Sequence, residues 1–362
     1  MTSKRKGWDW WSEAKLEVLR AYLPRFTQVV RAHSPEAICL DLFAGSFENN
    51  RRHEPGTFPG SAQIALRTEP PFTRIALFEL QDPAARLSAA VQAAMPGDPR
   101  WRVFPGDCNV SLPEALTWLD PIRWAPTFAF LDPRGLQVAW STVERLAKWR
   151  SDKKTKVEQW ILLPEPALAR VLGLRGARGE RSALRLDRLY GTRDWLAIHQ
   201  LRRSNSITPD EMRAEFVNLL RWRLENELHY ATTHALQIVN TRGHPVYTLV
   251  FATDSPPGDR IMSHIYANTA ATTIPSMQAR AQVVRQHQSL DEQGVLRLPG
   301  LDEYELDTAS GPSGSYSHIP PWSPPELRDD TLDLEGEPDI DPDDIDPETW
   351  AEQLDDVEPD AD

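Results

Sequence analysis

Residues 37–47 have the sequence Ala-Ile-Cys-Leu-Asp-Leu-Phe-Ala-Gly-Ser-Phe. A short apolar run that reaches Asp41 and is followed by the small residues Ala44, Gly45 and Ser46 is typical of a buried parallel strand and its glycine turn. Small residues at that point let the backbone approach a ligand at the carboxyl end of the strand, where open α/β sheets bind. The segment therefore predicts the first strand of such a sheet, with Asp41 placed to receive a cationic group or a water molecule. An ordinary strand-to-helix turn is the alternative.

Further strands are predicted downstream, and helical patterns separate them. They cover residues 75–78, 101–104, 127–131 and 158–163. Strands that alternate with helices predict a doubly wound, mostly parallel sheet. Residues 235–240 and 246–252 then flank the turn Thr-Arg-Gly-His-Pro, which is typical of an antiparallel hairpin. The predicted fold class is α/β, a doubly wound and mostly parallel sheet closed by an antiparallel hairpin.

The chain divides into four predicted regions. The apolar spacing before the first strand predicts a helix, which Pro24 should kink or divide. Glu48 to Pro59 reads as a long polar loop. The regions are 1–36, an N-terminal helical region that packs on the sheet; 37–270, the α/β domain with a basic helical insertion near 165–230; 271–300, a helical extension; and 301–362, a disordered acidic tail.

The net charge of −13 is unevenly distributed. Residues 301–362 carry 22 Asp and Glu against the single base Arg328, a net charge of −21, so residues 1–300 carry +8. The tail also holds nine prolines and few apolar residues, and cannot repay the entropy of ordering. A mildly basic globular part and an acidic disordered tail are expected.

Composition also limits the compartment and the kind of site. Two cysteines, Cys39 and Cys108, suit a reducing cytoplasm and exclude a disulfide framework or a cysteine-rich zinc site. No run approaches the ~20 apolar residues that span a bilayer, and the basic N-terminus lacks the apolar segment of a secretory signal. His229 and His234 show no metal-ligand spacing, so no metal site is predicted. We expect a cytoplasmic protein.

Acidic residues end four predicted strands in succession: Asp41, Glu79, Asp107 and Asp132. Because parallel strands bring their carboxyl ends to one edge of the sheet, these side chains are predicted to border a single crevice. The alternative is that they are helix caps and turn formers, for which Asp is common.

The first turn and the strand inventory resemble those of class I S-adenosylmethionine (SAM) methyltransferases. The resemblance implies that SAM is the cofactor, with Asp41 at its ammonium and Gly45 beside its methionine part. It also implies that Glu79 accepts hydrogen bonds from the ribose hydroxyls and that Asp107 with the Cys108 amide reads the adenine edge. Phe43 belongs to the same predicted cofactor-binding set. A carboxylate-lined edge suits the sulfonium cation of SAM.

Asp132-Pro133-Arg134-Gly135 is the predicted catalytic site. It resembles the Asn/Asp-Pro-Pro-aromatic motif after the fourth strand of amino-methyltransferases, which holds the target amine for in-line displacement. The resemblance implies that Asp132 is the acceptor of the amine or a base. Arg134 and Gly135 replace the second proline and the aromatic residue, so Arg134 could instead bind a carboxylate or phosphate. Cys108 follows the third strand and is interpreted as a buried or turn thiol.

A basic stretch, residues 170–203, carries nine Arg and three acidic residues. Together with Lys153, Lys154 and Lys156 it could meet nucleic-acid phosphates. A solvated face, or a docking surface for the acidic tail, is the alternative.

Taken together, several motifs resemble the three-Cys-motif partner (TcmP) family over roughly residues 8–270. They are Leu40-Asp-Leu-Phe-Ala-Gly45, Gly60-Ser61, Gly106-Asp-Cys-Asn109, Phe130-Leu-Asp-Pro-Arg-Gly135 with Trp140, Tyr190-Gly191 with Asp194-Trp195, and Tyr247-Thr-Leu-Val-Phe-Ala-Thr-Asp254 with Gly258 and Ile261-Met262. The resemblance implies a methyltransferase-like fold and, as a partner, a three-Cys-motif protein similar to radical-SAM enzymes.

Two functional hypotheses follow. The first is a SAM-dependent methyltransferase that acts on an amine or another polar acceptor, such as one in nucleic acid. The second is a non-catalytic partner that keeps this fold as a docking surface. Phe47, which is bulky where a small residue is expected after Gly45, and the altered Asp132-Pro-Arg-Gly135 site motivate the second hypothesis.

Overall fold

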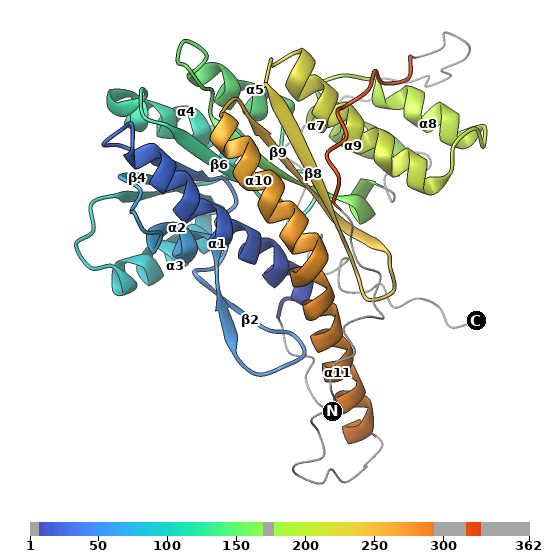
Figure 1. The fold of residues 1–362 in the computed structure, drawn as a ribbon, viewed down its shortest axis with the longest axis horizontal. Coiled ribbons are helices and arrows are strands. Elements are labelled where there is room, and N and C mark those ends of the chain that lie inside the picture. Colours follow the sequence, from blue (N-terminus) through green and yellow to red (C-terminus); the bar gives the residue numbers. More distant parts are fainter. Residues whose placement is uncertain (1–6, 169–176, 293–315, 327–362) are drawn as a thin grey trace. The chain divides into compact units, whose positions relative to one another are not determined.

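A computed structural model of the chain describes residues 7–168, 177–292 and 316–326. A central seven-stranded sheet runs through residues 38–253, with the strand order β5-β4-β1-β6-β7-β9-β8 (Figure 1). The strands are β1 Ile38–Asp41, β4 Arg74–Glu79, β5 Trp101–Pro105, β6 Thr127–Leu131, β7 Glu158–Pro164, β8 Thr232–Val239 and β9 Pro245–Thr253.

The first five of these strands are parallel, and β9 pairs antiparallel with β7 and with β8. The chain therefore has an α/β fold whose parallel sheet is closed by an antiparallel hairpin at one edge, as predicted. Counted along the chain, the sheet order is 3-2-1-4-5-7-6, the order of a class I methyltransferase-like sheet.

Alternating side chains of the strands enter two hydrophobic cores, one on each face. In β1, Ile38 and Leu40 belong to one core and Cys39 to the other. β6 divides in the same way, with Leu131 in the first core and Phe130 in the second. This alternation is what the period of two of a strand requires when both faces are covered.

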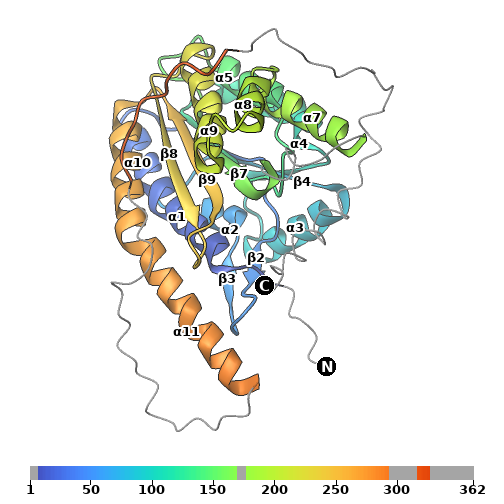
Figure 2. The same ribbon diagram turned by 90° about the vertical axis from the view of Figure 1, so that its right-hand side faces the viewer.

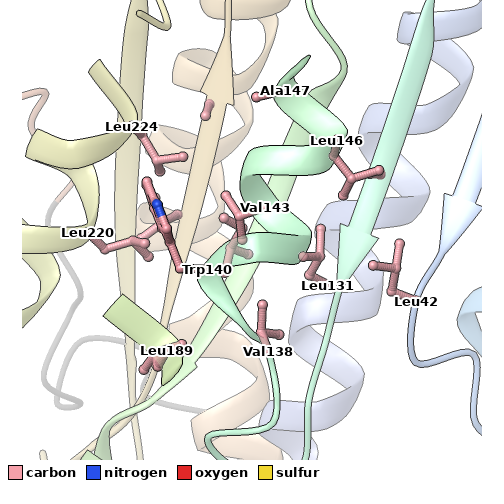
Figure 3. Packing of buried hydrophobic residues seen from close by; sticks show 14 of the residues in the cluster. Leu42, Leu131, Val138, Trp140, Val143, Leu146, Ala147, Leu189, Leu220 and Leu224 are labelled. Atoms are coloured by element: carbon pink, nitrogen blue, oxygen red, sulfur yellow. The ribbon is translucent and has the colours of Figure 1, made fainter. Parts of the chain in front are cut away.

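Helices cover both faces, and Figure 2 shows them on either side of the sheet. The first core is completed by α4 Cys108–Leu119, α5 Trp140–Trp149, α7 Ala177–Tyr190, α8 Trp195–Arg203 and α9 Pro209–Asn226. Figure 3 shows Trp140 of α5 packed beside Leu220 and Leu224 of α9 in this core. The second core is completed by α1 Trp10–Arg31, α2 Ser61–Leu66, α3 Gln81–Ala94, α10 Pro256–Asn268 and α11 Ile274–Glu292.

The N-terminal helix α1 is a single helix from Trp10 to Arg31. Pro24 lies inside it, yet the helix is not divided. The flanking residues Tyr22, Leu23 and Phe26 are buried in the second core. Packing of the helix therefore offsets the backbone hydrogen bond that a proline removes.

The segment predicted as a long loop after β1 contains a small antiparallel sheet. It consists of β2 Glu48–Asn50 and β3 Thr57–Pro59. Gly60 then returns the chain to the first turn, because a Cβ there would lie 2.0 Å from the Ser46 carbonyl oxygen. The two ends of the hairpin therefore lie close together, next to the turn that follows β1. Its polar composition hid it from the sequence analysis.

The prediction of a disordered tail over residues 301–362 does not hold for residues 316–325. These residues follow the surface of α9 and β8 and bond to buried side chains there. Tyr316 and Trp322 supply aromatic contacts that a purely acidic tail lacks. Residues 301–315 and 327–362 of the predicted tail lie outside the described residues.

Candidate functional site at the carboxyl edge of the sheet

Three of the predicted acidic residues gather at the tips of the neighbouring strands β4, β1 and β6. Asp41 is the last residue of β1, Glu79 the last of β4, and Asp132 directly follows β6. They are close enough that the charges of Asp132 and Glu79 raise the pKa of Asp41. The fourth, Asp107, follows β5 at the edge of the same sheet.

Asp41 has a carboxylate without a partner. The residue is 1 % exposed, and neither of its carboxylate oxygens has a hydrogen-bond partner among the described residues. Burial raises the pKa of Asp41 to about 7, with a further increase from Asp132 and Glu79. The Ser61 hydroxyl and the Phe43 backbone amide lie near enough to offset part of this rise in pKa. An unpaired buried carboxyl group is costly and marks a place where a cationic partner would be stabilised.

The turn after β1 is fixed by Glu79. Gly45 adopts φ +60°, a conformation that favours glycine, and its amide donates to Glu79 Oε2 at 2.7 Å. Glu79 Oε1 accepts from the Leu80 amide at 2.8 Å. Each carboxylate oxygen keeps a second acceptor site, so this arrangement leaves Glu79 able to bind a hydroxyl as well. Phe43 packs against the first core and Phe47 against the second.

Asp107 and Cys108 begin α4. Asp107 caps the helix by accepting from the Asn109 amide at 2.9 Å, and its other oxygen lies 3.2 Å from Arg188 of α7. Cys108 is buried, which raises the pKa of its thiol. A buried thiol of raised pKa is a poor nucleophile. Asp107 thus performs the capping role that was the alternative to adenine binding, although capping does not exclude a contact with a ligand.

Asp132 holds the ammonium group of Lys15, a residue of α1. Lys15 Nζ lies 2.7 Å from Oδ1 and 2.6 Å from Oδ2, and both side chains are largely buried. The same ammonium lies 5.2 Å from the centre of the Tyr247 ring. Burial alone would lower the pKa of Lys15, but the charges of Asp132 and Tyr247 and the hydrogen bond to Asp132 together outweigh it, so the pKa is raised. The tip of β6 therefore binds an amine in its protonated form.

Arg134 is the exposed member of this group. Its guanidinium lies 5.3 Å from the centre of the Trp8 ring, and its backbone amide donates to Gln137 Oε1 at 3.2 Å. Trp8 is held in turn by a hydrogen bond from its amide to the Asn50 carbonyl of β2. Arg134 thus connects the loop after β6 to the N-terminal segment and the β2–β3 hairpin.

The sequence analysis missed Lys15. Its position gave a usable signal, since Lys15, Leu19, Tyr22 and Phe26 follow steps of four, three and four residues and so share one helix face. A lysine on an apolar face needs a buried anion, and Asp132 lies 117 residues away.

Arginines of the predicted basic stretch form ion pairs within the protein. Among the described part of the 170–203 stretch, Arg188 and Arg193 pair with Asp107 and Asp187. A cavity of about 360 Å³ lies between α4 and α5, and one of about 480 Å³ lies between α1 and the end of α10. No group of three or more metal-ligating side chains occurs within the described residues. No helix in that part of the chain is long and apolar enough to cross a membrane.

No protein-family model and no curated protein matches the chain. Among solved structures, a putative O-methyltransferase from Klebsiella pneumoniae is similar with 12% identity and a TM-score of 0.34, covering 67% of this chain and 88% of that one. A protein from Legionella pneumophila has 12% identity and a TM-score of 0.39, covering 70% and 92%. These are distant similarities, so the assignment of the fold rests on the strand order described above, and no membership of the three-Cys-motif partner family is established.

Proposed function

We propose that the chain binds SAM at the carboxyl edge of its sheet and transfers the methyl group to an amine. The observation that carries this proposal is the buried carboxylate of Asp41, for which the described part of the chain supplies no hydrogen-bond partner. SAM has an ammonium and a sulfonium group, and either would provide the positive charge that Asp41 lacks. The left-handed turn at Gly45 beside it leaves the backbone accessible, because a Cβ on Gly45 would meet only the Phe43 carbonyl oxygen at 3.9 Å.

The residues present fit the cofactor at more than one point. Glu79 keeps free acceptor sites for hydroxyl groups while it fixes the Gly45 turn. SAM, when bound, supplies an activated methyl group on sulfur. The chain's own contribution is to position the acceptor nitrogen, which is the principal source of rate in an in-line displacement.

The choice of an amine as acceptor rests on Lys15. Its ammonium is paired with Asp132, and this pairing supports a role for the carboxylate in holding a protonated nitrogen. We propose that the acceptor amine displaces the Lys15 ammonium from Asp132 and is held there, and that Asp132 takes up the proton that the acceptor nitrogen loses as it gains the methyl group. Arg134, exposed beside it, would bind an anionic part of the same acceptor.

Isothermal titration calorimetry with SAM and with S-adenosylhomocysteine tests the binding step. Wild-type protein should bind both, and Asp41→Asn should weaken SAM binding at least about tenfold, the equivalent of about 1.4 kcal/mol. Asp152→Asn, at an exposed aspartate, is the matched control and should leave binding unchanged. Absence of binding at millimolar concentration, or equal binding by Asp41→Asn, would reject the proposal.

A second function is favoured by the same ion pair. Lys15 and Asp132 neutralise each other in a largely buried position, which is also what a non-catalytic protein would retain to stabilise its fold. In that case the chain would act as the docking partner of a three-Cys-motif protein. Turnover of SAM that is lost in Asp132→Ala would decide for the enzyme, and co-purification with such a partner without turnover would decide for the docking protein.

A further inference from the structure

A segment of the chain's own C-terminal region lies along α9 and the outer strand β8. Residues 316–325, called the strap below, have the sequence Tyr-Ser-His-Ile-Pro-Pro-Trp-Ser-Pro-Pro. The strap contains neither helix nor strand, and Figure 1 shows it as the red trace that crosses these elements. Its contacts with the rest of the protein follow the pattern of a bound peptide.

Asn218 of α9 recognises the backbone of the strap. Its side-chain Nδ2 donates to the Trp322 carbonyl and its Oδ1 accepts from the Trp322 amide, both at 2.9 Å. Asn218 is 1 % exposed. An amide side chain that pairs with both polar groups of one residue fixes an extended chain without reading its side chain.

Arg221, one helical turn further along α9, makes the next contact. Its Nη2 donates to the Ile319 carbonyl at 2.6 Å and to the Thr233 carbonyl of β8 at 2.9 Å. Glu225 of α9 accepts from the Thr233 amide at 2.7 Å. The guanidinium is therefore held in place by β8 and presents a donor to the strap.

Tyr316 anchors the start of the strap. Its hydroxyl contacts His234 Nδ1, while His234 Nε2 lies 2.6 Å from Asp259 of α10. The Tyr316 ring packs edge-on against Tyr266, with 5.4 Å between ring centres. His234 is buried, and the residues that receive Tyr316 come from two elements, β8 and α10.

The composition of the strap suits such a site. Four of its residues are prolines, which have no amide hydrogen to satisfy and lose little entropy on binding. The Trp322 indole N–H lies 3.0 Å from both carboxylate oxygens of Glu215, and Trp322 remains 41% exposed. The strap is therefore held mainly through backbone groups, the Tyr316 anchor and one indole hydrogen bond.

We propose that the α9–β8 face is a peptide-binding site for an extended, proline-rich segment with a leading tyrosine and a central tryptophan. The strap is its resident ligand. The connection from α11 to the strap is 23 residues long, and this covalent link raises the local concentration of the strap at the site above that of a separate peptide. A peptide of the same sequence supplied separately competes only when the anchors of the strap are weakened.

The test uses the full-length chain carrying Tyr316→Ala and Trp322→Ala, and a fluorescently labelled peptide of residues 315–326. Fluorescence anisotropy should show binding to this double variant at least about tenfold tighter than to the wild-type chain, whose own strap competes. Adding Asn218→Ala to the double variant should weaken binding at least about tenfold. Arg203→Ala, on the neighbouring helix α8, is the control and should have no effect.

Peptide variants keep the test independent of protein folding. A peptide with alanine in place of both aromatic residues should not bind, and a scrambled peptide of the same composition should not bind either. Failure of the double variant, shown to be folded by circular dichroism, to bind the native peptide would overturn the proposal. So would equal binding of the scrambled peptide.

Discussion

Burial in the folded chain favours the protonated form of Asp41 as long as no cation reaches it. Its pKa of about 7 lies above the ordinary value of 3.8, so the folded chain holds a proton that the unfolded chain releases between these values. The contribution of this group to stability is therefore fully present below about pH 4 and is lost as the pH rises towards 7. Asp41 in the charged form is the costly state at neutral pH.

Asp41→Asn should consequently stabilise the unliganded protein at pH 8. The pKa difference corresponds to at most about 4 kcal/mol in the free energy of unfolding, because each unit of pKa difference is worth about 1.4 kcal/mol. Chemical denaturation of both proteins at pH 5 and pH 8 measures this, and the advantage of the variant should be larger at pH 8. An advantage that is the same at both pH values would contradict the proposed burial of the charge.

The location of Asp41, Glu79 and Asp132 could be predicted because each ends a strand of a recognisable parallel pattern. Their partners could not. Glu79 accepts a hydrogen bond from the Gly45 amide, which is distant in sequence and is brought to it by the pairing of the strands. Lys15 reaches Asp132 only once α1 has packed on the sheet. Such pairings depend on how helices meet the sheet, which local sequence does not encode.

At the scale of elements, α1 contributes a charge to the site as well as apolar packing. Lys15→Met should leave the Asp132 carboxylate buried without a partner and destabilise the protein by about 3 kcal/mol. The double variant Lys15→Met, Asp132→Asn should recover much of this loss, because no charge then remains unpaired. Urea denaturation gives the four free energies of unfolding, and purely additive losses would show that the pair is not coupled.

The strap should respond to pH through His234. Burial lowers the pKa of His234, an effect opposed by Asp259 and reinforced by His318 and Arg221. Because the folded state favours the neutral ring, the stability due to this contact is present above pH 6.5 and is lost as the pH falls below it. Hydrogen exchange of residues 316–325 should accelerate between pH 7 and pH 5.5 relative to the intrinsic rate, and His234→Gln should lose this dependence.

The elements themselves were largely predictable, with instructive exceptions. The parallel strands, the closing hairpin and the helices between the strands followed from apolar periodicity and turn chemistry, whereas the order of the strands came from the structure. The β2–β3 hairpin and the strap did not, because both are polar or proline-rich segments whose order comes from contacts with distant residues such as Asn218. Amino-acid composition indicates that such a segment cannot form a hydrophobic core of its own, but it does not indicate that the segment binds to the surface of another element.

At the scale of the molecule, the chain is electrically divided, with +8 on residues 1–300 and −21 on residues 301–362. We propose that the basic part binds nucleic acid and that the acidic tail competes with it. Replacing the acidic residues of 329–362 by Asn and Gln should raise the salt concentration needed for elution from heparin, since retention through phosphate-like charges falls with salt. Unchanged elution would show that the tail does not compete.

Two side chains of α9 make hydrogen bonds to the backbone of Thr233 in β8. β8 is the last strand of the sheet, and Glu225 and Arg221 occupy the amide and carbonyl that Thr233 turns outward. An outermost strand with vacant backbone groups is a template for aggregation between chains. The side chains of α9 therefore take the place of a neighbouring strand at this edge of the sheet. The double variant Arg221→Ala, Glu225→Ala should form β-rich aggregates under conditions in which the wild type does not aggregate.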